Sequence, residues 1–146
     1  MNIANILLKA SQKYPDRSAI SIGSEVLYTF RSLYLRVSYL AASMQQKLLL
    51  KPGDRVAIVM PNHPEYLVIR YAAWFAGLTV VPINSKLHGL EISYMLNHSG
   101  SSACFTLTQL TQTLTSDSYA RQTTVSVIDV ESEEYRDMTK ARQAIE

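Results

Sequence analysis

Cysteine is almost absent from this sequence, and its scarcity excludes two kinds of site. Cys104 is the single cysteine among 146 residues, so the chain cannot form an internal disulfide. A metal site built from several thiolates is excluded for the same reason. A protein without disulfides suits a reducing compartment, and we expect a cytoplasmic location.

Glycines are few and scattered. The chain has 5, at positions 23, 53, 77, 89 and 100. Loops that bind phosphate bring several backbone N–H groups close to the ligand, which generally requires clustered glycines. The sequence has no GxGxxG motif and no P-loop, and it lacks the GxSxG motif of hydrolases. We therefore expect no self-contained ATP or dinucleotide site in these residues, and no cofactor bound by them alone.

Long apolar runs and blocks of charge are also missing. The stretch AAWFAGLTVVPI contains Gly77 and Pro82 and is shorter than the roughly 20 residues that a membrane helix needs. Lys9 interrupts the apolar residues near the start, so no secretion signal is expected. The net charge is +2 and the basic residues are scattered, which predicts no nucleic-acid partner. The length and the 47% apolar content predict a single compact domain over residues 1–146, whose α/β class follows from the alternation of strands and helices described below.

The histidines do not form a metal-binding pattern. His63, His88 and His98 lack the i, i+4 spacing of a helical ligand pair, and no metal site is predicted. His98 falls in the last turn of a predicted helix, where an imidazolium meets the negative end of the helix dipole. Asp129, near the end of a predicted strand, is interpreted as the N-cap of the next helix.

The first half of the chain predicts a helix, a hairpin and a second helix. Apolar residues recur at helical spacing over residues 3–13, and Pro15 ends this helix. The strand-like runs SAISI and EVLYT are joined by Gly23-Ser24, which suits a two-residue turn. An amphipathic helix follows over residues 30–49, with Thr29 as its N-cap.

The second half alternates strands with helices. VAIVM predicts a buried central strand, and the next helix is expected to be capped by Asn62, to carry Glu65 in capping-box spacing, and to end at Gly77. Further strands are predicted for VVPI, ACFTL and TTVSVIDV, with helices over residues 89–98 and 131–145. Such alternation requires right-handed crossovers. The predicted fold is a doubly wound, mostly parallel α/β sheet flanked by helices, with an N-terminal helix and β-hairpin.

Ligands of open α/β sheets bind at the carboxyl ends of the strands. The candidate loops are Pro61-Asn62-His63-Pro64, Asn84-Ser85-Lys86-Leu87-His88, Thr108-Gln109 and Glu131-Ser132. The loop with Lys86 and His88 is the densest in ionisable groups, and it is either a reactive site or only a joint between a strand and a helix. The polar tract from Thr106 to Thr115 is interpreted as a surface loop or an exposed helix in preference to a phosphate contact.

Three segments occur in a specific order: NIANIL with YPDRSAI, then VLYTFRSLYLRVSYLAASM, then the block from KPGDRVAI to SSACF. In this order, over residues 2–107, they resemble the N-terminal segment of the AMP-forming, adenylate-forming ligases, which include the acyl-CoA synthetases. Two departures stand out. Ser32 replaces the capping-box acid of the second helix, so a weaker cap is expected, and Gly89 replaces a common proline, so a looser helix start is expected.

The resemblance implies the first lobe of the large domain of a two-step ligase. ATP and a carboxylic acid give an acyl-adenylate and pyrophosphate, and then a thiol, usually coenzyme A, displaces AMP. Mg²⁺ assists the first step. The family's phosphate loop, adenine motif, ribose-binding aspartate, hinge and C-terminal lysine have no counterpart in residues 1–146. No catalytic residue can therefore be assigned, and Lys86 and His88 are expected at most to contact ligand once the missing lobe is in place.

Two hypotheses follow. The first is an N-terminal fragment of an acyl-CoA ligase, inactive alone, whose partner is the remainder of that ligase. Apolar surface normally covered by the remainder should then be exposed and favour self-association. The second is a stand-alone α/β binding or interaction module derived from such a ligase. In neither case does the sequence identify the acyl group: fatty, aryl and short-chain acids stay open.

Overall fold

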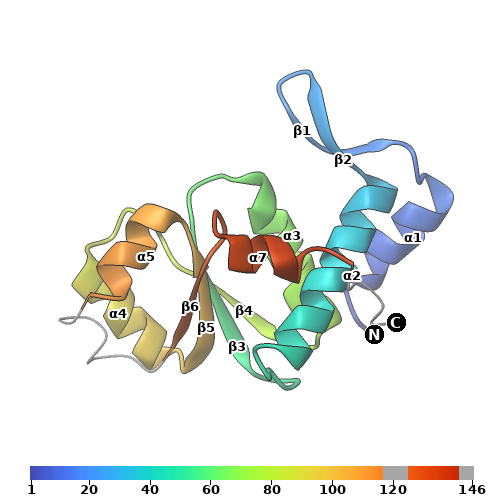
Figure 1. The fold of residues 1–146 in the computed structure, drawn as a ribbon. Helices are drawn as coiled ribbons and strands as arrows, with labels where there is room; N and C mark the ends of the chain where they lie inside the picture. The colour runs from blue at the N-terminus through green and yellow to red at the C-terminus, as the bar shows by residue number, and fades with distance from the viewer. Residues whose placement is uncertain (117–124, 142–146) are drawn as a thin grey trace.

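The computed structural model describes residues 1–116 and 125–141. In Figure 1 a helix and a hairpin at one end of the molecule precede a sheet that is flanked by helices. The elements are α1 Asn5–Lys13, β1 Ser18–Ile22, β2 Glu25–Thr29, α2 Phe30–Gln46, β3 Arg55–Val59, α3 Pro64–Phe75, β4 Thr79–Pro82, α4 Gly89–His98, β5 Ser101–Thr106, α5 Thr108–Leu114, β6 Ser126–Asp129 and α7 Glu133–Met138.

The larger sheet has the strand order β4-β3-β5-β6, and all neighbouring strands in it are parallel. The chain moves from β3 outward to β4, and then returns past β3 to β5 and β6. Because right-handed crossovers in opposite directions place their helices on opposite faces, α3 covers one face, while α4 and α5 cover the other. The predicted doubly wound α/β fold is confirmed, and β3 is the interior strand expected from VAIVM.

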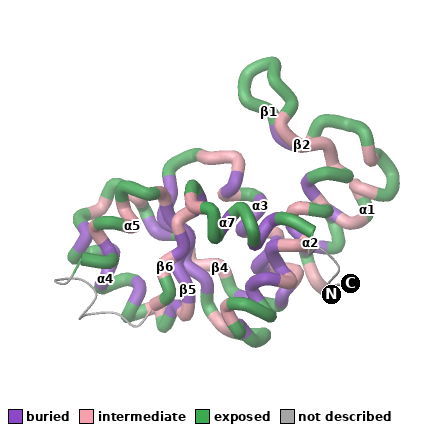
Figure 2. Tube along the Cα trace, in the orientation of Figure 1, coloured by how far each residue is buried: buried purple, intermediate pink, exposed green. Residues whose placement is uncertain are grey.

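Two apolar cores lie on the two faces of the sheet. Along β3, Val56 and Ile58 face the core under α2, α3 and α7, whereas Ala57 and Val59 face the core under α4 and α5. All four are fully buried, which is why this strand reads as a continuous apolar run and not as an alternating one. Figure 2 shows the buried residues concentrated in the central strands and in the inner sides of the helices.

The N-terminal elements follow local sequence signals closely. Ile22 pairs with Glu25 across the turn, and Gly23 has a φ of 57°, as expected for the two-residue hairpin. Thr29 caps α2 as predicted. Ser32 keeps both bonds of the capping box: its hydroxyl accepts from the Thr29 N–H at 2.9 Å, and its own N–H donates to the Thr29 hydroxyl at 3.2 Å.

Two predicted helix caps are wrong. Asn62 does not cap α3; His63 does, because Pro64 occupies the first helical position and the cap must be the residue before it. The Glu65 side chain consequently makes no capping box. Asp129 does not cap α7 either: its Oδ1 accepts from the Glu131 N–H at 2.8 Å in a turn, and the cap is Ser132.

Several element boundaries also differ from the predicted ones. The helix expected over residues 30–49 ends at Gln46, and Leu49 lies in the left-handed region with a φ of 55°, which no helix accommodates. The last helix ends at Met138, not at residue 145, and residues 142–145 lie outside the described part of the chain, as do residues 123–124 of the predicted last strand. Within the residues described, none of the helices combines the length and the apolar character needed to cross a bilayer.

Candidate functional site

A pocket lies beyond the carboxyl ends of β3 and β4, and we call it the β3–β4 pocket. The sequence placed its candidate loops at this edge of the sheet, and the structure brings two of them together because β3 and β4 are neighbours. The pocket has a volume of about 620 Å³. It is lined by Met60, Pro61, Asn62, Tyr66, Pro82, Ile83, Asn84, Ser85 and Lys86.

Apolar and polar groups share the lining of the β3–β4 pocket. Met60 and Ile83 are buried, whereas Asn62, Asn84 and Lys86 are exposed. The Asn84 side chain accepts from the Lys86 N–H at 2.9 Å, which closes a tight turn at the start of the loop. Lys86 is the one charged residue among the described residues that line the pocket, so it favours an anionic group there.

The two histidines of these loops serve as helix caps. The His63 Nδ1 accepts from the Glu65 N–H at 3.1 Å, and the His88 Nδ1 accepts from the Leu90 N–H at 3.2 Å. The loop around Lys86 and His88 is therefore a joint between β4 and α4, in which Lys86, but not His88, lines the pocket.

The third histidine and the acidic residues do not add a metal site. His98 lies in the last turn of α4, as predicted, and its ring stacks on Tyr94 with centroids 5.5 Å apart. Over residues 1–116 and 125–141, no group of three or more histidine, cysteine, aspartate or glutamate side chains is placed to hold a metal ion.

The loops after β5 and β6 form a separate pair at the same edge of the sheet. The Thr108 N–H donates to Glu131 Oε1 at 3.3 Å, which joins the two loops. Neither loop lines the β3–β4 pocket. The threonine-rich tract is largely the helix α5, and the Thr111 and Thr113 hydroxyls donate to backbone carbonyls one turn earlier. The interpretation of an exposed helix holds for residues 108–115, although Leu114 on the inner side of α5 is buried. It is wrong for Thr106, which ends β5, is fully buried and donates its hydroxyl to the Val59 carbonyl at 2.8 Å.

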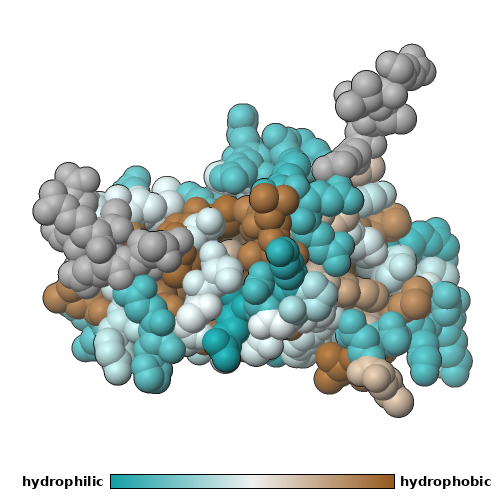
Figure 3. Space-filling view, turned by 90° about the horizontal axis from the view of Figure 1, so that it is seen from below, coloured by the Kyte–Doolittle hydropathy of each residue, from teal (hydrophilic) through white to brown (hydrophobic). Residues whose placement is uncertain are grey.

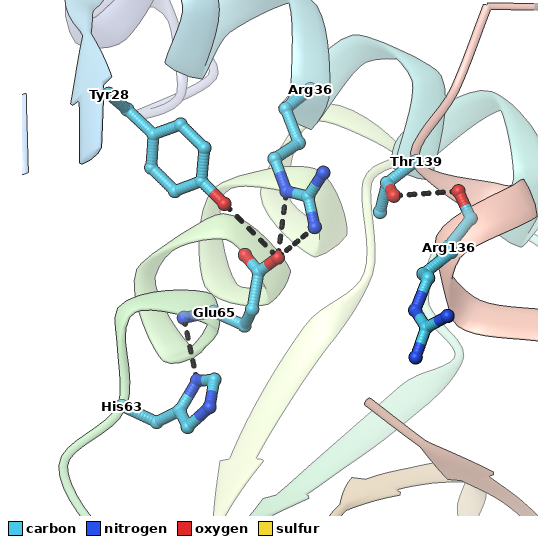
Figure 4. A network of polar contacts seen from close by, with 6 residues as sticks. All are labelled: Tyr28, Arg36, His63, Glu65, Arg136 and Thr139. Carbon is cyan, nitrogen blue, oxygen red and sulfur yellow. Dashed lines mark hydrogen bonds and ion pairs between the residues drawn. The ribbon is translucent and has the colours of Figure 1, made fainter. Parts of the chain in front are cut away.

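The first turn of α3 contributes Tyr66 to the lining of the β3–β4 pocket, and we call this part of the lining the α3 wall. The neighbouring residue, Glu65, forms a buried ion pair with Arg36. Figure 4 shows Arg36 from α2 reaching the carboxylate of Glu65 in the first turn of α3. Both Nε, at 2.7 Å, and Nη2 of Arg36 donate to Glu65 Oε1, and the Tyr28 hydroxyl donates to the same oxygen at 3.4 Å. The Arg36 guanidinium also lies over the rings of Tyr28 and Tyr135, at 5.5 and 5.9 Å from their centroids.

This network changes the proton affinity of its members. Burial lowers the pKa of Arg36, but the hydrogen bonds and the charge of Glu65 outweigh burial and raise it overall. Burial, and next the negative charge of Glu65, raise the pKa of Tyr28 and of Tyr135. Two buried atoms, Glu65 Oε2 and the Tyr135 hydroxyl, have no hydrogen-bond partner among the described residues. At neutral pH the cluster therefore holds a charged arginine and two neutral phenols.

Sequence reasoning did not identify this network, although one signal for Arg36 was available. Arg36 lies three residues after Leu33 and four before Leu40, so it occupies a position on the apolar stripe of α2. A charged residue on that stripe must either reach solvent or find a buried partner. The partner, Glu65, is 29 residues away and could not be chosen from the sequence pattern.

Cys104, the single cysteine, is a core residue. It lies in β5 and packs with Ala57, Ile92 and Leu96 under α4. Burial raises the pKa of the Cys104 thiol to about 12. A neutral, enclosed thiol is a poor nucleophile and a poor metal ligand.

Comparisons with known proteins match nearly the whole chain, and not only residues 2–107, which carried the resemblance in the sequence. The family model described as AMP-binding enzyme matches residues 7–145. The chain belongs to the AMP-binding enzyme family. A long-chain-fatty-acid–CoA ligase of Salmonella typhimurium is 36% identical over 113 residues, which cover 77% of this chain and 20% of that protein. A feruloyl-CoA synthase of an Amycolatopsis species is 36% identical over 95 residues, 65% of this chain and 19% of the other.

A solved structure extends the likeness to the fold of the family. The o-succinylbenzoate CoA synthetase of Bacillus subtilis, in complex with its acyl-adenylate intermediate, matches with a TM-score of 0.76 and 25% identity, over 97% of this chain and 34% of that one. The resemblance to the N-terminal part of the AMP-forming ligases is thus confirmed. The chain spans about a fifth of the length of these two curated relatives.

Proposed function

We propose that this chain is the N-terminal part of an ATP-dependent, AMP-forming ligase that joins a carboxylic acid to coenzyme A. The observation that carries the proposal is the family match over residues 7–145, which includes every element of the sheet and both loops of the β3–β4 pocket. Relatives named as CoA ligases and a CoA synthetase bound to an acyl-adenylate support the same reaction class.

In this proposal the chain forms the first lobe of the large domain and contributes the β3–β4 pocket to one side of the active site. The remainder of the ligase supplies the catalytic groups. The five glycines are isolated, and four of them have positive φ at turns, so they do not form a phosphate loop. ATP, coenzyme A and Mg²⁺ therefore belong to the longer enzyme, and the 146 residues alone are inactive. With a single buried thiol, the chain suits the reducing environment of the cytoplasm.

The identity of the carboxylic acid stays open within the proposal. The relatives are named for long-chain fatty acids, a feruloyl group and o-succinylbenzoate, and these acids differ widely in size and polarity. The β3–β4 pocket has one exposed cation, Lys86, and a lining that is both polar and apolar. A pocket with these features suits an anionic or polar part of a ligand better than a long apolar acyl chain.

A chimeric ligase tests the proposal. The matched 113-residue segment of the Salmonella typhimurium ligase is replaced by the present chain, and acyl-CoA formation is measured with ATP, Mg²⁺, coenzyme A and a panel of fatty, aryl and short-chain acids. We expect acyl-CoA from at least one acid. The host ligase without the segment is the negative control, and Lys86→Arg is paired with Lys86→Glu to test the pocket. A chimera that folds, as judged by circular dichroism, but forms no acyl-CoA from any acid contradicts the proposal.

A second experiment separates the ligase fragment from a stand-alone module. The purified chain should show no carboxylate-dependent pyrophosphate exchange, and exchange would refute its inactivity alone. The codons after Glu146 are equally informative, because an in-frame phosphate-loop motif supports the ligase and a stop codon supports the module.

Self-association is a further part of the proposal, because apolar side chains reach the surface. The exposed large apolar residues include Ile6, Ile22, Val26, Leu90 and Tyr94. Figure 3 shows hydrophobic residues, in brown, at several places on the face seen from below. Sedimentation at increasing concentration should show association, together with binding of an apolar dye. A chain that stays monomeric and binds no dye would show that this surface is tolerated in water.

A further inference from the structure

Glu65 is held from two sides at the point where α3 begins. Its backbone N–H donates to the ring of His63, and its side chain, only 8% exposed, turns toward α2. The next residue, Tyr66, lines the β3–β4 pocket together with Pro61 and Asn62. The first turn of α3 therefore has one side in the pocket wall and the other side in a buried ion pair.

Contacts other than the ion pair with Glu65 also restrict the position of Arg36. Its side chain is 25% exposed, and its guanidinium lies over two tyrosine rings that come from β2 and α7. A planar guanidinium that donates twice to one carboxylate oxygen restricts the position of that oxygen, which a lysine ammonium group cannot do in the same way. The hairpin, α2 and α7 thus act together on the start of α3.

We propose that Arg36 is a positioning residue that sets the place of the α3 wall of the β3–β4 pocket. Without Arg36, the buried Glu65 carboxylate loses two of its hydrogen bonds and its counter-charge. A buried charge without a partner moves toward water. The first turn of α3 would then turn or unwind, and Tyr66 would move with it. The inference rests on the proposed function only for the use of the pocket, because the position of the wall can be measured without any ligase activity.

Hydrogen exchange of individual backbone amides, followed by NMR on the whole chain, tests this inference. The amides of Glu65 and Tyr66 donate to His63 and report on the wall, and the amide of Ile92, which donates to His88, reports on α4. In Arg36→Met we expect exchange at Glu65 and Tyr66 to accelerate at least about tenfold more than at Ile92. Glu65→Gln should have the same effect in weaker form.

Two further variants keep the test decisive. Arg31→Met removes another arginine of α2, whose partner Asp16 lies at 3.5 Å on the surface with both side chains more than half exposed, and it should leave all three amides unchanged. Arg36→Lys keeps the charge and covers the case in which Arg36→Met does not fold; it should still accelerate exchange at Glu65 and Tyr66 selectively. Equal acceleration at all three amides, or none at all in either Arg36 variant, overturns the inference whatever the chimeric ligase shows.

Discussion

Replacing Tyr135 with phenylalanine should stabilise the protein. Tyr135 is 1% exposed, and its hydroxyl has no hydrogen-bond partner among the described residues. Burying a polar group without a partner costs about 1–3 kcal/mol. Phenylalanine keeps the ring, and with it the edge contact to Phe105 at 6.2 Å and the position under Arg36 at 5.9 Å. We therefore expect the free energy of unfolding to rise by about 1–2 kcal/mol.

Urea unfolding, followed by the fluorescence of the single tryptophan Trp74, measures this change. With a denaturant slope of about 2 kcal/mol per molar, the midpoint should rise by roughly 0.5–1 M. Tyr28→Phe is the matched control, because the Tyr28 hydroxyl is bonded to Glu65 at 3.4 Å. Removing that bond should lower the free energy of unfolding by about 0.5–1.5 kcal/mol. A lower midpoint for Tyr135→Phe would show that the hydroxyl makes a net favourable contact, and would refute the reasoning.

The same variant has a distinct pH dependence. Burial raises the pKa of Tyr135 above its ordinary value of 10.0, so the folded state retains this proton more strongly than the unfolded state does. Below pH 10 the hydroxyl is protonated in both states, and this group makes the free energy of unfolding independent of pH. Above pH 10 only the unfolded chain releases the proton, so the free energy of unfolding falls as the pH rises. Above pH 10 the stability of the wild type should fall more steeply than that of Tyr135→Phe. Parallel pH curves would contradict this assignment.

Two further predictions concern the core and a helix cap. The Cys104 thiol, buried with a pKa of about 12, should react with a thiol-specific disulfide reagent at about pH 8 only as fast as the chain opens, and a rate equal to that of a free thiol would contradict its burial. Thr29→Ala removes the acceptor for the Ser32 N–H and should lower the free energy of unfolding by about 1 kcal/mol in the urea assay. An unchanged midpoint would mean that packing of the hairpin, and not the cap, sets the start of α2.

Much of the fold could be predicted because its signals are local. The buried run of β3, the turn at Gly23, and the end of α3 before Gly77, whose φ is 74°, each depend on a few adjacent residues. The family could be recognised for a related reason, since the order of these segments is carried by the chain itself. The errors were local as well: Pro64 takes the first helical position, so the cap falls on His63 and not on Asn62.

The candidate site depended on information that the sequence pattern does not contain. The alternation of strands and helices placed four loops at one edge of the sheet. Only the tertiary structure shows that the loops after β3 and β4 share a pocket and that the loops after β5 and β6 are joined by a hydrogen bond. The charge of Arg36 was visible on an apolar stripe, yet its partner came from a helix 29 residues away. Helices, turns and the family were determined by the sequence alone, because short-range sterics and hydrogen bonds decide them. The pocket and its buried ion pair were decided by the tertiary structure, because packing two faces of a sheet determines which distant side chains meet.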